Sequence, residues 1–260
     1  SRPEEMNMKG ILTKAEARTF VKCENFLWHV RCQLHYIANR SEEVINFNDQ
    51  KEMALRLGYE DRKGLMGVER FMRHYFLIAR EVGDLTRSIC SILEERQKKS
   101  VPVISKALTF LYAKNLDGFI VTSGRINIPG DSFFTEDPLN ILRLFYFSSE
   151  QNLLIHPNAV KALRESLSLV NAKLRASREA NDLFLKILLS KKNAESTLRA
   201  MNESGVLGRF ISDFGKIVGL MQFNMYHHFT ADEHLLRAIG ELNKLFYSSG
   251  SNVPDLVRDL

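Results

Sequence analysis

The stretch LMGVERFMRHYFLIAREVGDLTRSICSILEERQ, residues 65–97, decides the fold class. Its apolar residues recur at alternating steps of three and four, which is the period of one face of an α-helix. The repeating positions are Leu65, Val68, Met72, Tyr75, Ala79, Val82, Thr86, Ile89 and Leu93. Because the pattern persists for about four heptads, it predicts one long helix over 65–97 whose apolar face must be buried against a partner.

The segment before this stretch is the predicted partner. Thr13 followed by Glu16 forms a capping box, so a helix should begin there, and a second apolar stripe continues to about Asn39. Asp49 with Glu52 forms another capping box and predicts a short helix between the two long ones. Long helices with a short connection pack antiparallel. The sequence therefore predicts an antiparallel pair.

The remainder of the chain also favours helices. His156 followed by Pro157 predicts a helix that runs to about residue 174. The convincing strand signal is GFIVTSGRINI, residues 118–128, where β-branched residues flank a Ser-Gly turn. The predicted fold is mainly α: a helical bundle with a long antiparallel helix pair and one small β-hairpin at about 118–128.

Composition and charge exclude several classes of protein. Lys and Arg outnumber Asp and Glu by 36 to 31 without a compact basic cluster, so no nucleic-acid partner is predicted. No apolar run approaches the roughly 20 residues that cross a bilayer. Three widely spaced cysteines favour a reducing compartment, and we expect a cytoplasmic protein. Because the first residue is not Met, the chain is expected to be a piece of a longer protein.

The candidate site is MQFNMYHHFTADEHLLRAI, residues 221–239, which holds three of the seven histidines. Thr230 and Glu233 form a capping box, so a helix should begin at Ala231 with His234 in its first turn. Imidazole is the commonest metal ligand, but a catalytic metal site needs at least three ligands. From the residues alone, a histidine with structural hydrogen bonds at a helix start is therefore the favoured interpretation.

The same stretch, extended to FGKIVGLMQFNMYHHFTADEHLLRAIGEL, resembles the start of the HD phosphohydrolase domain in bifunctional PII uridylyltransferase/uridylyl-removing enzymes. The resemblance continues upstream through MNESGVLGRFISDFGKIV, VERFMRHYFLIAREVGDLTR and ENFLWHVRCQLHYIANR, and covers nearly the whole chain in order. It implies that residues 1–215 are the helical region following a nucleotidyltransferase domain whose core is absent. Residues 216–260 would be the N-terminal part of the HD domain.

The family carries out two opposed reactions: transfer of UMP from UTP to a tyrosine of the PII protein, and hydrolytic removal of that UMP. Transfer needs paired carboxylates, normally Asp-x-Asp, and this sequence contains no such pair. Removal at an HD site needs a first His, a His-Asp dipeptide and a later Asp around a divalent metal, Mg or Mn. His234 matches the first His, no His-Asp dipeptide occurs, and the other ligands are expected beyond residue 260.

The resemblance also implies further roles and partners. His227 matches a family position and, with Asp232 and Glu233, is expected to bind substrate or to support the metal ligand. His228 is expected at the surface. The implied partners are the nitrogen regulatory protein PII, UTP and UMP, with glutamine as an effector sensed by domains outside this chain. The chain alone is expected to be inactive in both directions.

Two other functions are compatible with parts of the sequence. One is a non-enzymatic helical module that binds a partner protein, although such a module has no reason to direct His227 and His234 into a common cleft. The other is the helical part of a tRNA-nucleotidyltransferase-like enzyme, which DPLNILRLF (137–145) suggests. The weakly basic charge gives no electrostatic footprint for tRNA.

Overall fold

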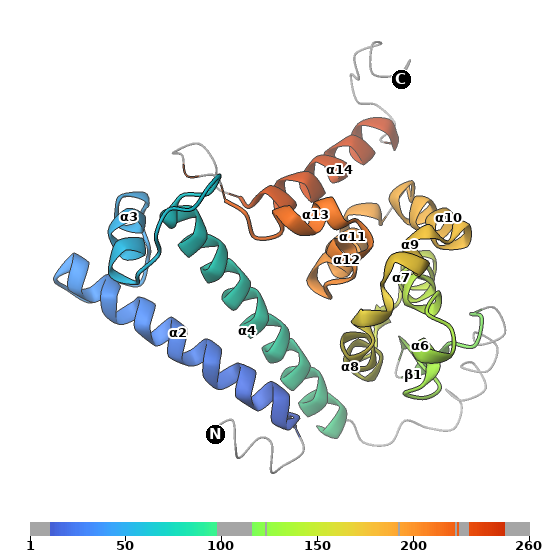
Figure 1. The fold of residues 1–260 in the computed structure, drawn as a ribbon. Coiled ribbons are helices and arrows are strands. Elements are labelled where there is room, and N and C mark those ends of the chain that lie inside the picture. The colour runs from blue at the N-terminus through green and yellow to red at the C-terminus, as the bar shows by residue number, and fades with distance from the viewer. Residues whose placement is uncertain are drawn as a thin grey trace. The chain divides into compact units, whose positions relative to one another are not determined.

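The protein is mainly helical, as predicted (Figure 1). The computed structural model describes residues 11–97, 116–122, 124–191, 193–221, 223 and 229–247. The chain forms two compact units. Unit 1 comprises Ser1–Lys99 and Ile217–Asp232, and unit 2 comprises Ser100–Lys216 and Glu233–Leu260.

Unit 1 is built on two long helices. α2 (Lys14–Ala38) and α4 (Gly67–Gln97) run in opposite directions and pack against each other, and the short helix α3 (Phe47–Arg56) packs on both (Figure 1). The predicted antiparallel pair is thereby confirmed.

Local capping explains where the first helices begin. The Thr13 hydroxyl accepts a hydrogen bond from the Glu16 amide at 3.2 Å, and the Glu16 carboxylate accepts from the Thr13 amide at 2.8 Å, so the predicted capping box is confirmed. Asn39 ends α2 in the left-handed conformation, with φ of 51°. The second predicted box is wrong. α3 begins before Asp49, with Asn46 as its N-cap, so Asp49 lies inside the first turn.

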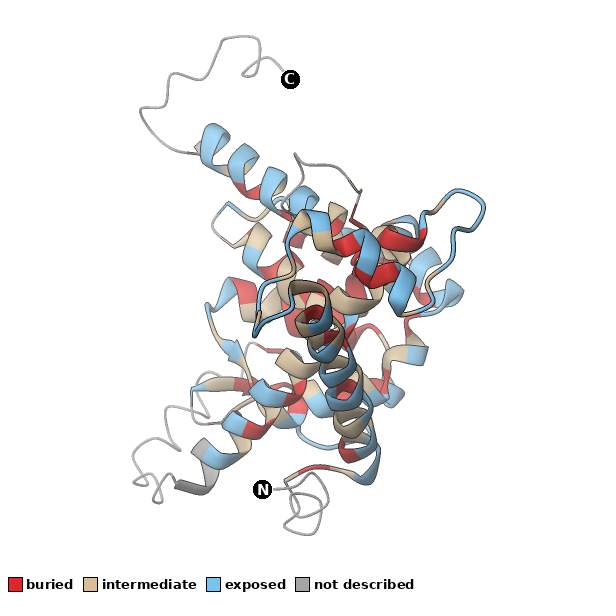
Figure 2. Cartoon of the chain, turned by 90° about the vertical axis from the view of Figure 1, so that its left-hand side faces the viewer, coloured by how far each residue is buried: buried red, intermediate tan, exposed pale blue. Residues whose placement is uncertain are grey.

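The core of unit 1 is a seam between α2, α3 and α4. Its buried residues are Val30, Leu34, Met53, Ala54, Val68, Phe71, Met72 and Met221. Figure 2 shows buried residues alternating with exposed ones along the helices. Along α4, Ile78 and Leu85 are buried, whereas the predicted seam positions Ala79 and Thr86 are exposed. At these two positions the buried seam therefore lies one residue earlier than the sequence predicted.

Unit 2 contains a small mixed sheet. β1 (Ile120–Thr122) pairs antiparallel with β2 (Arg125–Asn127), which confirms the hairpin. β2 also pairs parallel with β3 (Leu154–Ile155), a strand of two residues that the sequence did not predict. The outer edge of β2 in the hairpin is therefore paired with a third strand, β3.

Short helices make up the rest of unit 2, together with parts of two helices shared with unit 1. They are α6 (Phe133–Glu136), α7 (Asn140–Glu150), α8 (Pro157–Glu165), the 3₁₀ helix η1 (Leu167–Leu169), α9 (Ala172–Ala176), α10 (Arg178–Leu188), α11 (Ala194–Glu203), α12 (Val206–Phe210), α13 (Ser212–Ile217) and α14 (Ala231–Tyr247). The unit boundaries fall within α13, after Lys216, and within α14, after Asp232.

The predicted continuous helix from 156 to about 174 is wrong. His156 does begin α8, and its Nδ1 accepts from the Asn158 amide at 3.2 Å. The helical path then breaks into α8, η1 and α9 because the Asn171 side chain accepts from the amides of Lys173 and Leu174 and starts a new helix.

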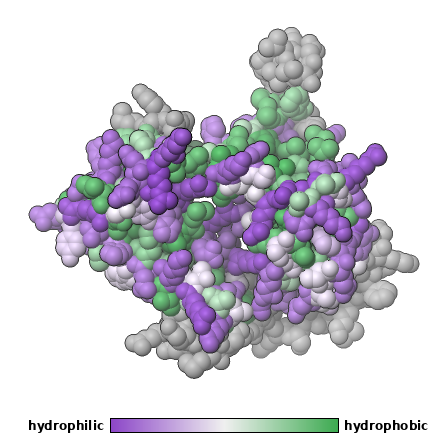
Figure 3. Space-filling model, in the orientation of Figure 1, coloured by the Kyte–Doolittle hydropathy of each residue, from purple (hydrophilic) through white to green (hydrophobic). Residues whose placement is uncertain are grey.

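Helix α14 carries apolar side chains on two sides. Leu236 is fully buried in the core of unit 2. Leu235, Leu242 and Phe246 are 45%, 48% and 50% exposed, and Figure 3 shows hydrophobic colour over this helix. Among the helices of the described ranges, none is both long enough and apolar enough to cross a membrane.

Candidate functional site

The candidate site lies at the start of α14. The helix begins at Ala231, as the spacing of Thr230 and Glu233 predicts, and His234 lies exposed in its first turn. An exposed imidazole at this place is free to approach an ion or a substrate from solvent. His227 and His228 lie outside the described residues.

Asp232 makes a structural hydrogen bond at the helix start. Its side chain is buried, and Oδ1 accepts from the Gly219 amide at 3.1 Å. The Ala231 amide donates to the Leu220 carbonyl at 2.8 Å. Within unit 1, these contacts join the first residues of α14 to the chain that leads from α13.

The chain after α13 is also fixed to α3 and α4 of unit 1. Arg73 donates from Nε to the Val218 carbonyl at 3.2 Å, and the Phe223 amide donates to Glu69 at the same distance. The Phe223 ring stacks on Phe47, with centroids 4.4 Å apart. The segment that precedes the histidine stretch is therefore held by hydrogen bonds of its backbone and by the packing of the Phe223 ring.

Glu233 connects α14 to α11 within unit 2. Its Oε2 accepts from Nη1 of Arg199, and its Oε1 accepts from Nε of Arg237 at 3.2 Å. Nη2 of Arg199 also donates to Glu195 at 2.8 Å. The hydrogen bond to Glu233 is the main cause that raises the pKa of Arg199 above its ordinary value. Both oxygens of Glu233 are thus engaged by arginine.

Gly240 marks the close approach of the same two helices. A Cβ at this position would overlap the carboxylate of Glu195. These atoms are the far end of a flexible side chain, so an alanine at this position would require the Glu195 carboxylate to move. Sequence reasoning did not find Arg199, and Gly240 within the helical pattern was the available signal of a close neighbour.

Among the described residues of the candidate site, one side chain could coordinate the divalent ion that the family implies. His234 is exposed, whereas Glu233 has both oxygens on protein partners and Asp232 accepts from a backbone amide. In the described part of the chain, no group of three or more His, Cys, Asp or Glu side chains could hold a metal ion. His234 is thus compatible with coordination, and these residues alone do not complete a metal site.

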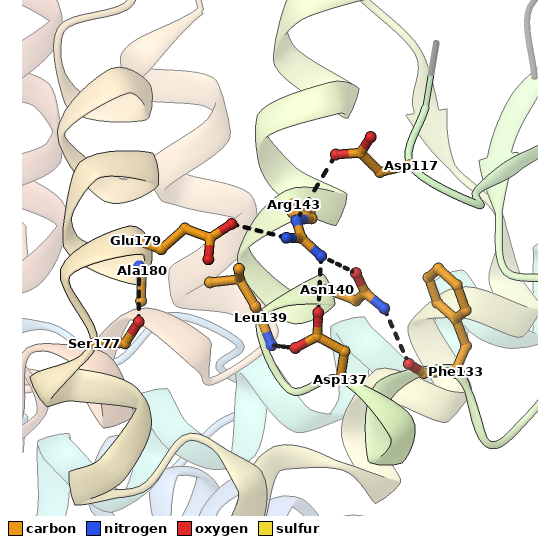
Figure 4. A network of polar contacts seen from close by, with 9 residues as sticks. All are labelled: Asp117, Phe133, Asp137, Leu139, Asn140, Arg143, Ser177, Glu179 and Ala180. Atoms are coloured by element: carbon orange, nitrogen blue, oxygen red, sulfur yellow. Dashed lines mark hydrogen bonds and ion pairs between the residues drawn. The ribbon is translucent and has the colours of Figure 1, made fainter. Parts of the chain in front are cut away.

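Arg143 is the centre of another polar network in unit 2 (Figure 4). Its Nη1 donates to Asp137 at 2.8 Å and to Asn140 at 3.0 Å, and its Nη2 donates to Glu179 at 2.8 Å. Asp117 lies 3.8 Å from Nε. Because protein acceptors surround the guanidinium, this arginine is suited to joining α7 to α10 rather than to binding a phosphate.

A cavity of about 260 Å³ lies on unit 1, beside α2 and α4. Its lining residues are Phe20, Glu24, Leu27, Trp28, Arg31 and Val82. Arg31 lies over the Trp28 ring at 5.1 Å and donates to Glu43 at 2.7 Å. The carboxylate of Glu43 therefore balances the charge of Arg31. The residues that line the cavity have no arrangement suited to acid–base or metal chemistry.

Comparison with known proteins identifies two successive parts of one family. The family model described as GlnD PII-uridylyltransferase matches residues 1–90, and the model described as Uridylyltransferase GlnD third domain matches residues 119–210. The candidate site at α14 lies beyond both matched ranges.

Curated relatives match along nearly the whole chain. The bifunctional uridylyltransferase/uridylyl-removing enzyme of Bradyrhizobium sp. (strain ORS 278) is 48% identical over 248 residues, which cover 93% of this chain and 26% of the relative. The enzyme of the same name from Bradyrhizobium sp. (strain BTAi1) gives the same identity and coverage. No solved structure matches. The chain, which spans about a quarter of the length of these relatives, belongs to the family of bifunctional uridylyltransferase/uridylyl-removing enzymes.

Proposed function

We propose that this chain is part of an enzyme that transfers UMP from UTP to the PII protein and hydrolytically removes it again. The observation that carries the proposal is the 48% identity, over 93% of the chain, to enzymes whose name states both activities. Regulation by glutamine through other parts of the protein and a cytoplasmic location belong to the same proposal. The three free cysteines suit a reducing compartment.

Within that enzyme, residues 1–215 follow the transferase domain and residues 216–260 begin the HD phosphohydrolase domain. The position of His234 supports this division, because its imidazole is exposed in the first turn of a helix. The contacts of Asp232 and Glu233 support a role in holding that helix. His227 remains a candidate for contact with the substrate.

His234 is the proposed ligand for a divalent ion, Mg or Mn. Such an ion, when bound, lowers the pKa of a coordinated water and stabilises charge on the phosphoryl group. The chain's own contribution is to present the imidazole of His234 in the first turn of α14. The remaining ligands are proposed to come from residues outside this chain.

The full-length enzyme provides the test. Purified wild type is given PII and UTP, and then uridylylated PII without UTP, and both rates are followed by mass spectrometry of PII. We expect His234→Ala to reduce UMP removal to roughly a hundredth or less, since a metal ligand is lost, and to leave transfer unchanged.

His29→Ala is the matched control, because His29 is also an exposed histidine on a helix, α2. It should keep both activities. Normal UMP removal by the His234→Ala enzyme would refute the metal-ligand assignment, and a wild type that cannot uridylylate PII would refute the function. The chain alone should do neither reaction, so UTP-dependent labelling of PII by it would contradict that expectation.

A further inference from the structure

We infer that the cavity beside α2 and α4 is a docking groove for PII, the protein substrate of the proposed enzyme. The groove receives an exposed segment of PII that carries one large apolar side chain next to a lysine or arginine. This inference rests on the proposed function and adds to it a surface that recognises the protein substrate. All the lining residues belong to unit 1 and lie within residues 1–90, which match the model described as GlnD PII-uridylyltransferase.

The groove is mainly apolar and opens at the surface. Phe20, Leu27 and Val82 are half-buried, and the Trp28 side chain beside them is 53% exposed. The volume of about 260 Å³ lies below the roughly 300–1,000 Å³ of typical small-molecule sites. A groove of this size suits a single large side chain inserted by a protein better than a whole nucleotide.

Trp28 is held in place before any partner binds. The guanidinium of Arg31 lies 5.1 Å from the centre of the Trp28 ring, and Arg31 donates to Glu43 from Nε at 3.1 Å and from Nη2 at 2.7 Å. A side chain that is already restrained loses less conformational freedom on binding. Tryptophan and arginine are also enriched among the residues that dominate the energy of protein interfaces. The exposed indole is therefore suited to anchor a protein partner.

Charge selects the chemistry of that partner. Glu43 balances the charge of Arg31, whereas no ion pair within the described ranges involves Glu24, which lines the same groove. An unbalanced carboxylate repels the phosphates of UTP and attracts a lysine or arginine. The groove therefore fits a protein segment in which a basic residue lies next to the apolar side chain, and it does not fit a nucleotide.

The test uses the full-length enzyme and purified PII. Calorimetry without UTP gives the Kd for PII, and initial rates of transfer give KM for PII, KM for UTP and kcat. For Trp28→Ala we expect the Kd and KM for PII to rise by about 10- to 30-fold, as truncation of a central aromatic residue does. KM for UTP and kcat should stay within about twofold, because the lining supplies no group to the chemistry.

Glu24 tests the charge separately from the apolar contact. Glu24→Lys should raise the Kd for PII by about 3- to 10-fold, because it places like charges together, and Glu24→Gln should raise it less. The wild-type affinity should fall as salt is added, and the affinity of Glu24→Gln should fall less steeply.

Tyr36→Ala is the matched control, because Tyr36 is a 71% exposed aromatic residue on the same helix, α2, and does not line the groove. It should bind PII and transfer UMP as wild type does. The melting temperatures of the Trp28, Glu24 and Tyr36 variants should stay within a few degrees of wild type, since these side chains are exposed.

Three results would overturn the inference. The first is a Trp28→Ala enzyme with wild-type Kd and KM for PII. The second is a changed oligomeric state in light scattering with an unchanged KM for PII, which would place a second copy in the groove. The third is a fall in kcat together with a lower melting temperature, which would show that another part of the same polypeptide covers the groove.

If Trp28→Ala does not fold, Glu24→Lys decides by the same criteria. The proposed function fails separately: a wild type that binds PII through Trp28 but does not uridylylate it would overturn that function and leave the docking groove standing.

Discussion

The two units hold their helices together with different kinds of polar contact. In unit 1, the Tyr59 hydroxyl contacts Nδ1 of His74, and burial raises the pKa of Tyr59 while it lowers that of His74, so both groups remain neutral. In unit 2, the helices are joined by arginines and carboxylates, at Arg143 and Arg199. The seam of long helices thus contains an uncharged pair, and the short helices are linked by charge.

Helix length explains the difference. A long helix such as α4 gains stability along its whole packed face, whereas helices of about ten residues are marginal in isolation and depend on tertiary contacts. Arg143 links α7 to α10 through Glu179, and Arg199 links α11 to α14 through Glu233. The stability of unit 1 should therefore depend mainly on how closely its helices pack. The stability of unit 2 should depend on the salt concentration.

The largest effect is expected where α4 begins. A Cβ at Gly67 would overlap the carbonyl oxygen of Tyr59, and backbone atoms cannot move aside as a side chain can. Gly67→Ala should lower the free energy of unfolding of unit 1 by about 2–3 kcal/mol, as overpacked sites do. Urea denaturation followed by circular dichroism measures it.

Gly83→Ala is the control for that change, because a Cβ there meets no atom within 4 Å and Gly83 lies inside the same helix. It should stabilise unit 1 by about 0.5–1 kcal/mol through helix propensity. Equal destabilisation by the two alanines would show that α4 does not depend on the fit at its first turn.

An intermediate effect is expected at Arg143. Its side chain is 21% exposed, and Arg143→Met should destabilise unit 2 by about 1–2 kcal/mol, a range discounted for the solvent exposure of its partners. The difference in stability between Arg143→Met and wild type should be smaller in about 1 M salt, because added ions screen the attraction between Arg143 and its carboxylate partners. Thermal unfolding at two ionic strengths measures both quantities.

Arg178→Met serves as the comparison, since Arg178 is 95% exposed and lies 3.9 Å from Asp182. Such a surface pair should contribute nothing measurable. If the two methionine variants have the same stability, the network in Figure 4 does not hold α7 to α10.

The smallest effect is a pH dependence of unit 1. Desolvation, with a smaller contribution from Lys22, lowers the pKa of His74 below its ordinary 6.5. The unfolded chain then binds the proton more readily than the folded one, so stability is complete above pH 6.5 and falls as the pH drops below it. His74→Gln should weaken this acid-side loss. An unchanged stability–pH profile in that variant would count against the neutral pair.

Local features were readable from the sequence, and contacts between distant elements were not. The Thr13 box and the His156 cap are satisfied within one turn of helix, so spacing alone reveals them. β3 consists of two residues and takes its partner from a distant strand, and the pair of Arg199 and Glu233 depends on how two helices cross. The spacing of residues within one helix does not show which other helix crosses it. The place of His234 in the first turn of α14 was predicted from the spacing of Thr230 and Glu233, whereas its proposed role as a metal ligand came from the family resemblance.

Unit 1 is assembled from two stretches of chain that unit 2 interrupts, and this has a consequence for biosynthesis. Met221 belongs to the core formed by α2, α3 and α4, yet it follows residues 100–216 in the sequence. A ribosome that adds about 5–20 residues per second needs on the order of ten seconds to bridge that interval. During this time the core of the nascent long-helix pair lacks Met221, while residues 100–216 are synthesised.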